Sequence, residues 1–271
     1  DWSCIDFSAV DVVVHLASRV HIVKEKEVDP KQAFWRVNVE GTRCLAEHAI
    51  QHGVKRFIFL SSAHVHGHIS DEDGFDEQSP FAPHSEYAAS KVAAEEMLQG
   101  LFKDTQSELV IIRPPLVYGP GVKANFLSLM HLVKRRVPLP LALVKNRRSM
   151  VYVHNLVDAI YTCLTHPNAA GKVFLVSDKG SLSTKALVQQ FGDYMGTKAY
   201  LFPCPLMVLR MLGYVFNKSN KVNSLIDNLK VKNSHISEQL SWQPPHSVDE
   251  GLKETVSWYL QSYLPSNDKE S

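Results

Sequence analysis

Short apolar runs recur along the chain and alternate with longer stretches whose apolar positions follow a helical spacing. Four of these runs, at residues 11–17, 55–61, 109–113 and 172–176, are rich in Val, Ile, Leu and Phe. A run that is apolar at nearly every position is typical of a parallel strand buried on both faces. A shorter run at 150–153 predicts one more strand.

Helices are predicted between the strands, beginning with a long one that Asp29-Pro30 opens and Gly53 closes. Strands that alternate with helices of ten or more residues imply βαβ units and a doubly wound, mostly parallel α/β sheet. In such sheets, ligands bind beyond the carboxyl ends of the strands. The further predicted helices cover residues 85–102, 125–136, 156–165 with Asn155 as the N-cap, and 184–195, and the remainder of the chain looks helical.

Composition narrows the classes of function. The 271 residues are 45% apolar and 21% charged, with a net charge of +1 and no basic stripe, which argues against nucleic-acid binding. The four cysteines are far apart and form no Cys-x-x-Cys. We therefore expect no disulfide framework and no metal site, and a cytoplasmic location is the simplest.

The most apolar stretch runs from Leu201 to Phe216. It contains two prolines and Arg210, and it is too short and too interrupted to span a bilayer. We expect a helix packed against a second lobe in this stretch, with contact to a membrane surface as the alternative.

An acid–base pair is predicted on the helix at 85–102. Tyr87 and Lys91 are four residues apart and therefore share one face of that helix. Because an ammonium beside a phenol favours phenolate, we expect Lys91 to lower the pKa of Tyr87 toward working pH. Ser61 and Ser62 end the strand at 55–61, where a hydroxyl can hydrogen-bond a reacting oxygen and hold the tyrosine. A tyrosine of this kind can move a proton while a nicotinamide carries the hydride.

These residues resemble those of the extended short-chain dehydrogenase/reductases, also called the NAD-dependent epimerase/dehydratase family. The resemblance implies a Rossmann-like dinucleotide-binding domain over residues 1–120 that lacks its first βαβ part. It also implies a smaller substrate-binding lobe over residues 121–271, from which elements near 150–176 return to the sheet. Further segments that resemble the family are His15-Leu-Ala17, Asn38-Val-Glu-Gly-Thr42, the loop from Arg113 to Gly121, Arg148 ahead of Val151 to Asp158, and Trp242-Gln-Pro-Pro.

The resemblance also implies a role for individual residues. Ser62, Tyr87 and Lys91 match the family's catalytic serine, tyrosine and lysine. Arg148 matches an arginine that family epimerases use on the substrate diphosphate, and His64 and Asn125 are expected to contact the sugar or the diphosphate. The expected cofactor is NAD, with NADP as an alternative, and the expected partner is a UDP-linked nucleotide sugar bound by a homodimer. The residues expected along the cofactor are Leu16, Ala17, Ser18, Asn38, Ser61, Tyr87, Lys91, Pro114, Leu116 and Val117.

Two departures from the family pattern affect these expectations. The glycine-rich phosphate turn is missing and the chain begins at Asp1, so we expect a fragment whose strand at 11–17 has an open edge and which binds NAD weakly. In addition, His64 and His66 stand where many family epimerases have Thr and Tyr. Together with His68 they alternate, so on an extended segment the three would share one side.

Four functions are open at this point. The first is epimerisation at C4 of a UDP-hexose or UDP-N-acetylhexosamine through a transient 4-keto sugar. The second is a UDP-4-keto-sugar reductase, the third is a 3β-hydroxysteroid-type dehydrogenase with the same triad, and the fourth is a non-catalytic binding fragment. A sugar dehydratase is disfavoured because Ala63-His64 supplies no carboxylate beside the serine. Arg148 favours a nucleotide sugar over a steroid because an arginine suits a diphosphate.

Overall fold

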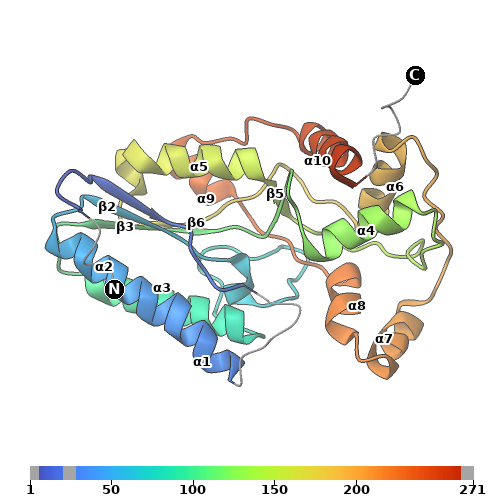
Figure 1. Cartoon of the computed structure of the whole chain (residues 1–271), viewed down its shortest axis with the longest axis horizontal. Coiled ribbons are helices and arrows are strands. Elements are labelled where there is room, and N and C mark those ends of the chain that lie inside the picture. Colours follow the sequence, from blue (N-terminus) through green and yellow to red (C-terminus); the bar gives the residue numbers. More distant parts are fainter. Residues whose placement is uncertain (1–5, 21–28, 264–271) are drawn as a thin grey trace, which may run out of the picture.

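The structure, a computed structural model, describes residues 6–20 and 29–263. A parallel sheet lies between two layers of helices, and a mostly helical lobe extends from one end of it (Figure 1). This arrangement confirms the predicted doubly wound α/β fold. The four strands lie in the order β1 (Val12–His15), β2 (Arg56–Leu60), β3 (Glu108–Arg113) and β6 (Val173–Leu175), so among the described residues β1 is an edge strand.

Successive residues of the strands point to opposite faces of the sheet and fill two separate cores. Phe57 and Phe59 of β2 pack with α2 (Thr42–Gln51) and α3 (Glu86–Phe102). Ile58, which lies between them, packs with α5 (Val153–Thr165) and α9 (Ser234–Leu240) on the other face. This is why the strands are apolar at nearly every position.

The long helix predicted after Asp29 is confirmed, but it is not a regular α-helix throughout. It consists of α1 (Pro30–Trp35), the π-helical segment η1 (Arg36–Gly41) and α2. The side chain of Asp29 accepts a hydrogen bond from the backbone N–H of Gln32 and so caps the first turn. Segments of π-helix are rare and often mark functional positions, and η1 contains Asn38.

Two local predictions are wrong. The segment after β3 is not a loop throughout, because β4 (Leu116–Tyr118) pairs in parallel with β5 (Met150–Tyr152). Asn155 does not cap α5, which begins at Val153 with Tyr152 as the N-cap. Its side-chain amide instead donates to the carboxylate of Asp178 at 2.7 Å and to the carbonyl of His246 at 2.9 Å, which ties α5 to two other segments.

The core of the lobe joins α4 (Ala124–Lys134), α6 (Thr184–Tyr194) and α10 (Val248–Tyr263). None of the helices in the described ranges is long and apolar enough to cross a membrane. The other elements are the 3₁₀ helices η2 (Ala63–His66) and η3 (Pro167–Ala169), and the helices α7 (Leu206–Val215) and α8 (Ser219–Ile226).

A buried ion pair connects α3 to the sheet. The guanidinium of Arg113, at the end of β3, donates through Nε to both carboxylate oxygens of Glu95 at 3.0 and 3.1 Å. The two side chains are only 3% and 0% exposed. Nη1 of Arg113 also lies 3.0 Å from Nε2 of His66 in η2. This network fixes α3 and η2 relative to the end of β3.

Replacing Glu95→Ala should therefore lower the free energy of unfolding by about 3–5 kcal/mol, because it leaves the Arg113 guanidinium buried without its counter-charge. Urea unfolding followed by circular dichroism measures the loss. The control is Lys55→Ala, which removes an ion pair to Asp11 whose side chains are 78% and 74% exposed and which should cost less than about 1 kcal/mol. Equal small losses in the two variants would show that the buried pair contributes no more than a surface pair.

Candidate active site

Helix α3 brings its tyrosine and lysine to the carboxyl end of β2. Ser85 caps the helix by accepting a hydrogen bond from the backbone N–H of Ala88 at 3.2 Å. Two residues further on, Tyr87 is half-buried, and one turn later Lys91 is 2% exposed. The ammonium of Lys91 donates to the carbonyl oxygen of Leu60 at 2.8 Å. The last residue of β2 is thus held against the helix, and Ser61 and Ser62 follow it directly.

Ser62 and Tyr87 interact in this arrangement, but the pKa of the tyrosine is not the one that we expected. Burial raises the pKa of Tyr87, and a hydrogen-bonding interaction with the Ser62 side chain opposes that rise only in part. The prediction that Lys91 lowers the pKa of Tyr87 is therefore wrong in this arrangement, because burial of the phenol has the largest effect and raises the pKa. Ser62 also accepts a hydrogen bond from the backbone N–H of His64 at 3.2 Å, which starts η2.

The pKa of Lys91 is lowered towards neutral pH. Burial lowers the pKa of its ammonium to about 8, and the carboxylate of Glu95 opposes this change. The same nitrogen lies 4.5 Å from the centre of the Phe59 ring, which contributes a cation–π contact. Lys91 is therefore a buried cation that can lose its proton close to working pH.

Asn38 joins the segment after β1 to α3. Its side-chain oxygen accepts from the backbone N–H of Arg19 at 2.7 Å and from the hydroxyl of Ser18 at 3.1 Å. Its amide nitrogen donates to the Ser90 hydroxyl at 2.9 Å, and that hydroxyl donates to the carbonyl of Tyr87 at 2.7 Å. The π-helical segment thus places one amide between Ser18 and the turn of α3 that carries the tyrosine and the lysine.

Several predicted cofactor contacts lie at the carboxyl ends of neighbouring strands. Leu16, directly after β1, is 53% exposed, and Leu116, at the start of β4, is 37% exposed. The hydroxyl oxygen of Ser61 is buried and has no hydrogen-bond partner within the described part of the chain. Exposed apolar side chains beside an unpaired hydroxyl fit a ligand with flat rings and polar edges, and NAD is such a ligand.

Three other predicted cofactor contacts differ in exposure. Ala17 is exposed. Pro114 is buried, and its carbonyl accepts from the backbone N–H of Ala63 at 2.9 Å. Val117 packs against the core beneath α5. Pro114 and Val117 therefore hold the strand ends in place, whereas Ala17 is open to a ligand.

Two of the three predicted substrate contacts lie close together. Burial lowers the pKa of His64 to about 4, and the charges of His84 and Arg148 add to this effect. The Nδ1 atom of His64 is buried and has no hydrogen-bond partner within residues 6–20 and 29–263. The guanidinium of Arg148 donates to the carbonyl of Asp227 at 3.1 Å. A neutral imidazole and a cation beside Ser62 suit a polar, anionic substrate.

The third predicted contact, Asn125, is engaged elsewhere. Its side-chain amide donates to the hydroxyl of Ser224 at 2.8 Å and so links α4 to α8. Its role at the substrate stays a prediction.

The three alternating histidines do not share one side, because residues 63–66 form the 3₁₀ helix η2 and not an extended segment. His66 points to Arg113. His68 is exposed, and its ring centre lies 4.5 Å from that of His84. Within the described ranges, no three His, Cys, Asp or Glu side chains form a group that could hold a metal ion.

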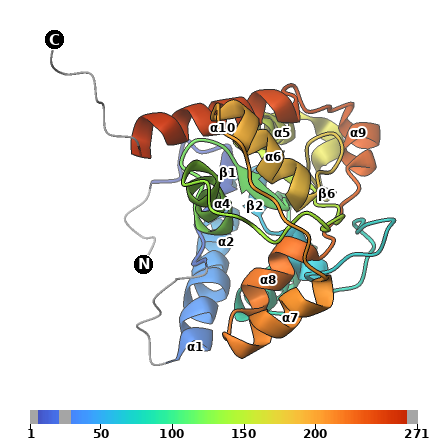
Figure 2. The same ribbon diagram turned by 90° about the vertical axis from the view of Figure 1, so that its right-hand side faces the viewer.

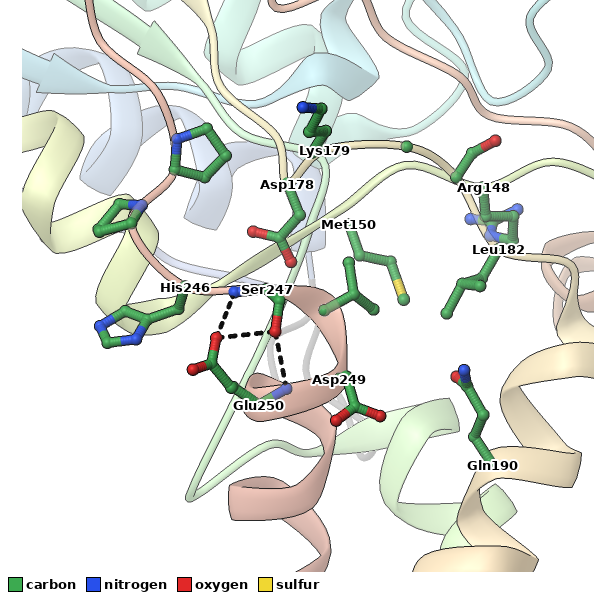
Figure 3. Close-up of a pocket in the computed structure, with 15 residues that line it drawn as sticks. Arg148, Met150, Asp178, Lys179, Leu182, Gln190, His246, Ser247, Asp249 and Glu250 are labelled. Atoms are coloured by element: carbon green, nitrogen blue, oxygen red, sulfur yellow. Dashed lines mark hydrogen bonds between the residues drawn. The ribbon is translucent and has the colours of Figure 1, made fainter.

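A cavity of about 660 Å³ is lined mainly by residues 178–182 and 244–250. Arg148 reaches it, but Ser62, Tyr87, Lys91 and His64 do not line it (Figure 3). Its acidic groups are already engaged. Glu250 accepts from the hydroxyl and the backbone N–H of Ser247, both at 2.7 Å, and Asp178 accepts from Tyr118, Tyr152 and Asn155. The active site is therefore assigned to the strand ends and not to this cavity.

Sequence reasoning missed two residues of the site. Ser90 relays the bond from Asn38, and its position between Tyr87 and Lys91 was the available signal. His84 lies against His64, with ring centres 5.5 Å apart. His84 directly precedes Ser85, the N-cap of α3. Because the start of this helix lies at the site, the position of His84 in the sequence would have indicated it.

Comparisons with known proteins agree with this geometry. Residues 3–177 match the NAD dependent epimerase/dehydratase family. The chain is 44% identical over 253 residues to a UDP-glucose 4-epimerase of Vibrio cholerae, an alignment that covers 93% of this chain and 77% of that protein. It is 29% identical to a dTDP-D-glucose 4,6-dehydratase of Mus musculus, over 94% of this chain and 69% of that protein.

Solved structures share the fold. The crystal structure of a UDP-glucuronic acid 4-epimerase from Bacillus cereus in complex with NAD has a TM-score of 0.77 at 21% identity, covering 97% of this chain and 80% of that one. The chain therefore belongs to the NAD dependent epimerase/dehydratase family of sugar-nucleotide enzymes. The expected family, fold class and cofactor are confirmed.

The low pKa of His64 has a direct test. Because burial disfavours the imidazolium, the ring should stay neutral at every pH above about 5. In an NMR titration of the histidine ring protons between pH 5.5 and 8, the His64 resonance should not move, and the variant His64→Asn identifies it by loss of the signal. A midpoint near the ordinary value of about 6.5 would contradict the burial of this ring.

Proposed function

We propose that the protein is an NAD-dependent epimerase that inverts C4 of a UDP-hexose or a UDP-N-acetylhexosamine. The observation that carries this proposal is the meeting of Ser62, Tyr87 and Lys91 at the end of β2, beside the cation of Arg148. The 44% identity to a UDP-glucose 4-epimerase supports the substrate class.

The proposed chemistry assigns one task to each side chain. Ser62 hydrogen-bonds the C4 oxygen, and Tyr87 removes its proton while Lys91 provides a nearby positive charge. When bound, NAD would supply a reversible hydride acceptor at C4. The site would have to let the 4-keto sugar present its opposite face before Tyr87 gives the proton back to the C4 oxygen. Protons and electrons balance within one cycle, and no external reductant is consumed.

The residues beside Ser62 bear on the alternatives. A dehydratase requires an acid and a base next to the serine, and this chain has Ala63 and a neutral His64 at those positions. A steroid has no charged group that would pair with the guanidinium of Arg148 near His64. A UDP-4-keto-sugar reductase would use the same triad, but it would consume one equivalent of NADH or NADPH for each turnover.

The proposal is tested by incubating the protein with NAD and UDP-galactose and following UDP-glucose by anion-exchange chromatography. We expect interconversion of the two UDP-sugars without net change in NADH absorbance. The turnover of the variant Tyr87→Phe should fall by about a hundredfold or more, because it lacks the general acid–base. Stoichiometric loss of NADH with a 4-keto sugar, and no interconversion, would assign the protein to the reductases. Wild-type turnover by Tyr87→Phe would remove Tyr87 from its role.

Arg148 has a matched control in its neighbour. Arg148→Ala should weaken binding of UDP-glucose by about 1.5–3 kcal/mol, the scale of a charge-assisted hydrogen bond, and should leave NAD affinity unchanged. Arg147, whose side chain is exposed, should tolerate the same substitution with a change below about 0.5 kcal/mol. Isothermal titration calorimetry of both variants measures the difference. Equal affinities in the two variants would place the diphosphate elsewhere.

A further inference from the structure

One helix of the lobe exposes an unusually apolar face. Met207, Met211 and Tyr214 of α7 are 84%, 58% and 81% exposed, and Val215 and Phe216 at its end are 67% and 66% exposed. The spacing of Met207, Met211 and Tyr214 by four and three places these three residues on one side of the helix, and Val215 and Phe216 follow directly at its end. An exposed apolar patch of this kind marks an interaction surface, because isolated soluble proteins rarely keep one. We call these five residues the α7 face.

The opposite side of α7 explains why this face points outward. Leu209 and Gly213 are the buried residues of the helix. A side chain at Gly213 would begin 3.0 Å from a methyl group of Val222 in α8, so the two helices are in close contact there. The inward side of α7 is thus already occupied, and the α7 face is left without a partner within the described residues.

The segment that carries this face is basic. Between Asp193 and Asp227 the sequence contains no Asp or Glu, but it contains Lys198, Arg210, Lys218 and Lys221. Arg210 pairs with Asp227 at 2.6 Å. Lys198, Lys218 and Lys221 are exposed. An apolar helix face in a segment with exposed lysines is typical of a helix that lies in the interface of a bilayer with anionic lipids.

We infer that the α7 face docks on the surface of an anionic lipid bilayer. Both views place α7 at the periphery of the molecule, at the end of the lobe (Figures 1 and 2), where a flat surface can reach it. A second copy of the chain is a poorer occupant, because a symmetric contact would bring lysines of the two copies together. The inference concerns attachment to a surface and not a span, and it is independent of the proposed epimerase activity.

The test is flotation of the protein on a density gradient with vesicles of phosphatidylcholine and phosphatidylglycerol at 3:1, and with vesicles of phosphatidylcholine alone. We expect binding to the anionic vesicles at least about tenfold stronger than to the neutral ones, and weaker binding at high salt. The variants Tyr214→Asp and Met211→Asp should lose about tenfold or more of this binding. The matched control is Tyr161→Asp on α5, whose side chain is 71% exposed far from the α7 face and which should bind like wild type.

Four outcomes would overturn the inference. The first is that the wild-type protein does not bind anionic vesicles, and the second is that the α7 variants and Tyr161→Asp lose equal amounts of binding. The third is a dimer in sedimentation equilibrium that only the α7 variants abolish, together with no binding of the wild type to vesicles. The fourth is a raised KM for UDP-galactose in the α7 variants, again without vesicle binding. The third would assign the face to a second copy, and the fourth to the substrate cleft. Thermal melting of each variant confirms that it is folded.

Discussion

The hydrogen bond from the buried ammonium of Lys91 to the carbonyl of Leu60 sets the geometry of the candidate site, because it joins α3 to the last residue of β2. A cation that is 2% exposed requires partners, and the structure supplies this carbonyl, the ring of Phe59 and the nearby Glu95. Glu95 in turn holds Arg113 at the end of the neighbouring strand. Tyr87, Ser62 and η2 are thus positioned by one chain of buried charges, and the chemistry depends on the same contacts as the packing.

Much of the fold was accessible from the sequence because its signals are local and periodic. The apolar runs at 55–61 and 109–113 are buried on both sides in the structure, and Asp29-Pro30 opens a helix, because both patterns reflect short-range physics. Tyr87 and Lys91 could be paired in advance because spacing by four residues fixes a shared helix face. Their place at the end of β2 followed from the general rule for parallel sheets.

The rest depended on tertiary contacts that no spacing encodes. The alternating histidines do not lie on one side because residues 63–66 form a 3₁₀ helix. In this helix His66 contacts the guanidinium of Arg113, which is 47 residues away in the sequence. The pKa of Tyr87 is raised because the effect of burial, which follows from the whole fold, is larger than that of the hydrogen bond to Ser62. Asn155 does not cap α5, because its side-chain amide donates to the buried carboxylate of Asp178.

In the proposed reaction, hydride would leave C4 and return to C4 of the same sugar while Tyr87 transfers the proton. The most direct measurement is conversion of UDP-galactose carrying deuterium at C4, in ordinary water, followed by mass spectrometry and NMR of the UDP-glucose formed. The account predicts that the deuterium is retained at C4 of the product, because the hydride is returned within one cycle. Loss of the deuterium to solvent, or its appearance in released NADH with a 4-keto sugar, would contradict the account.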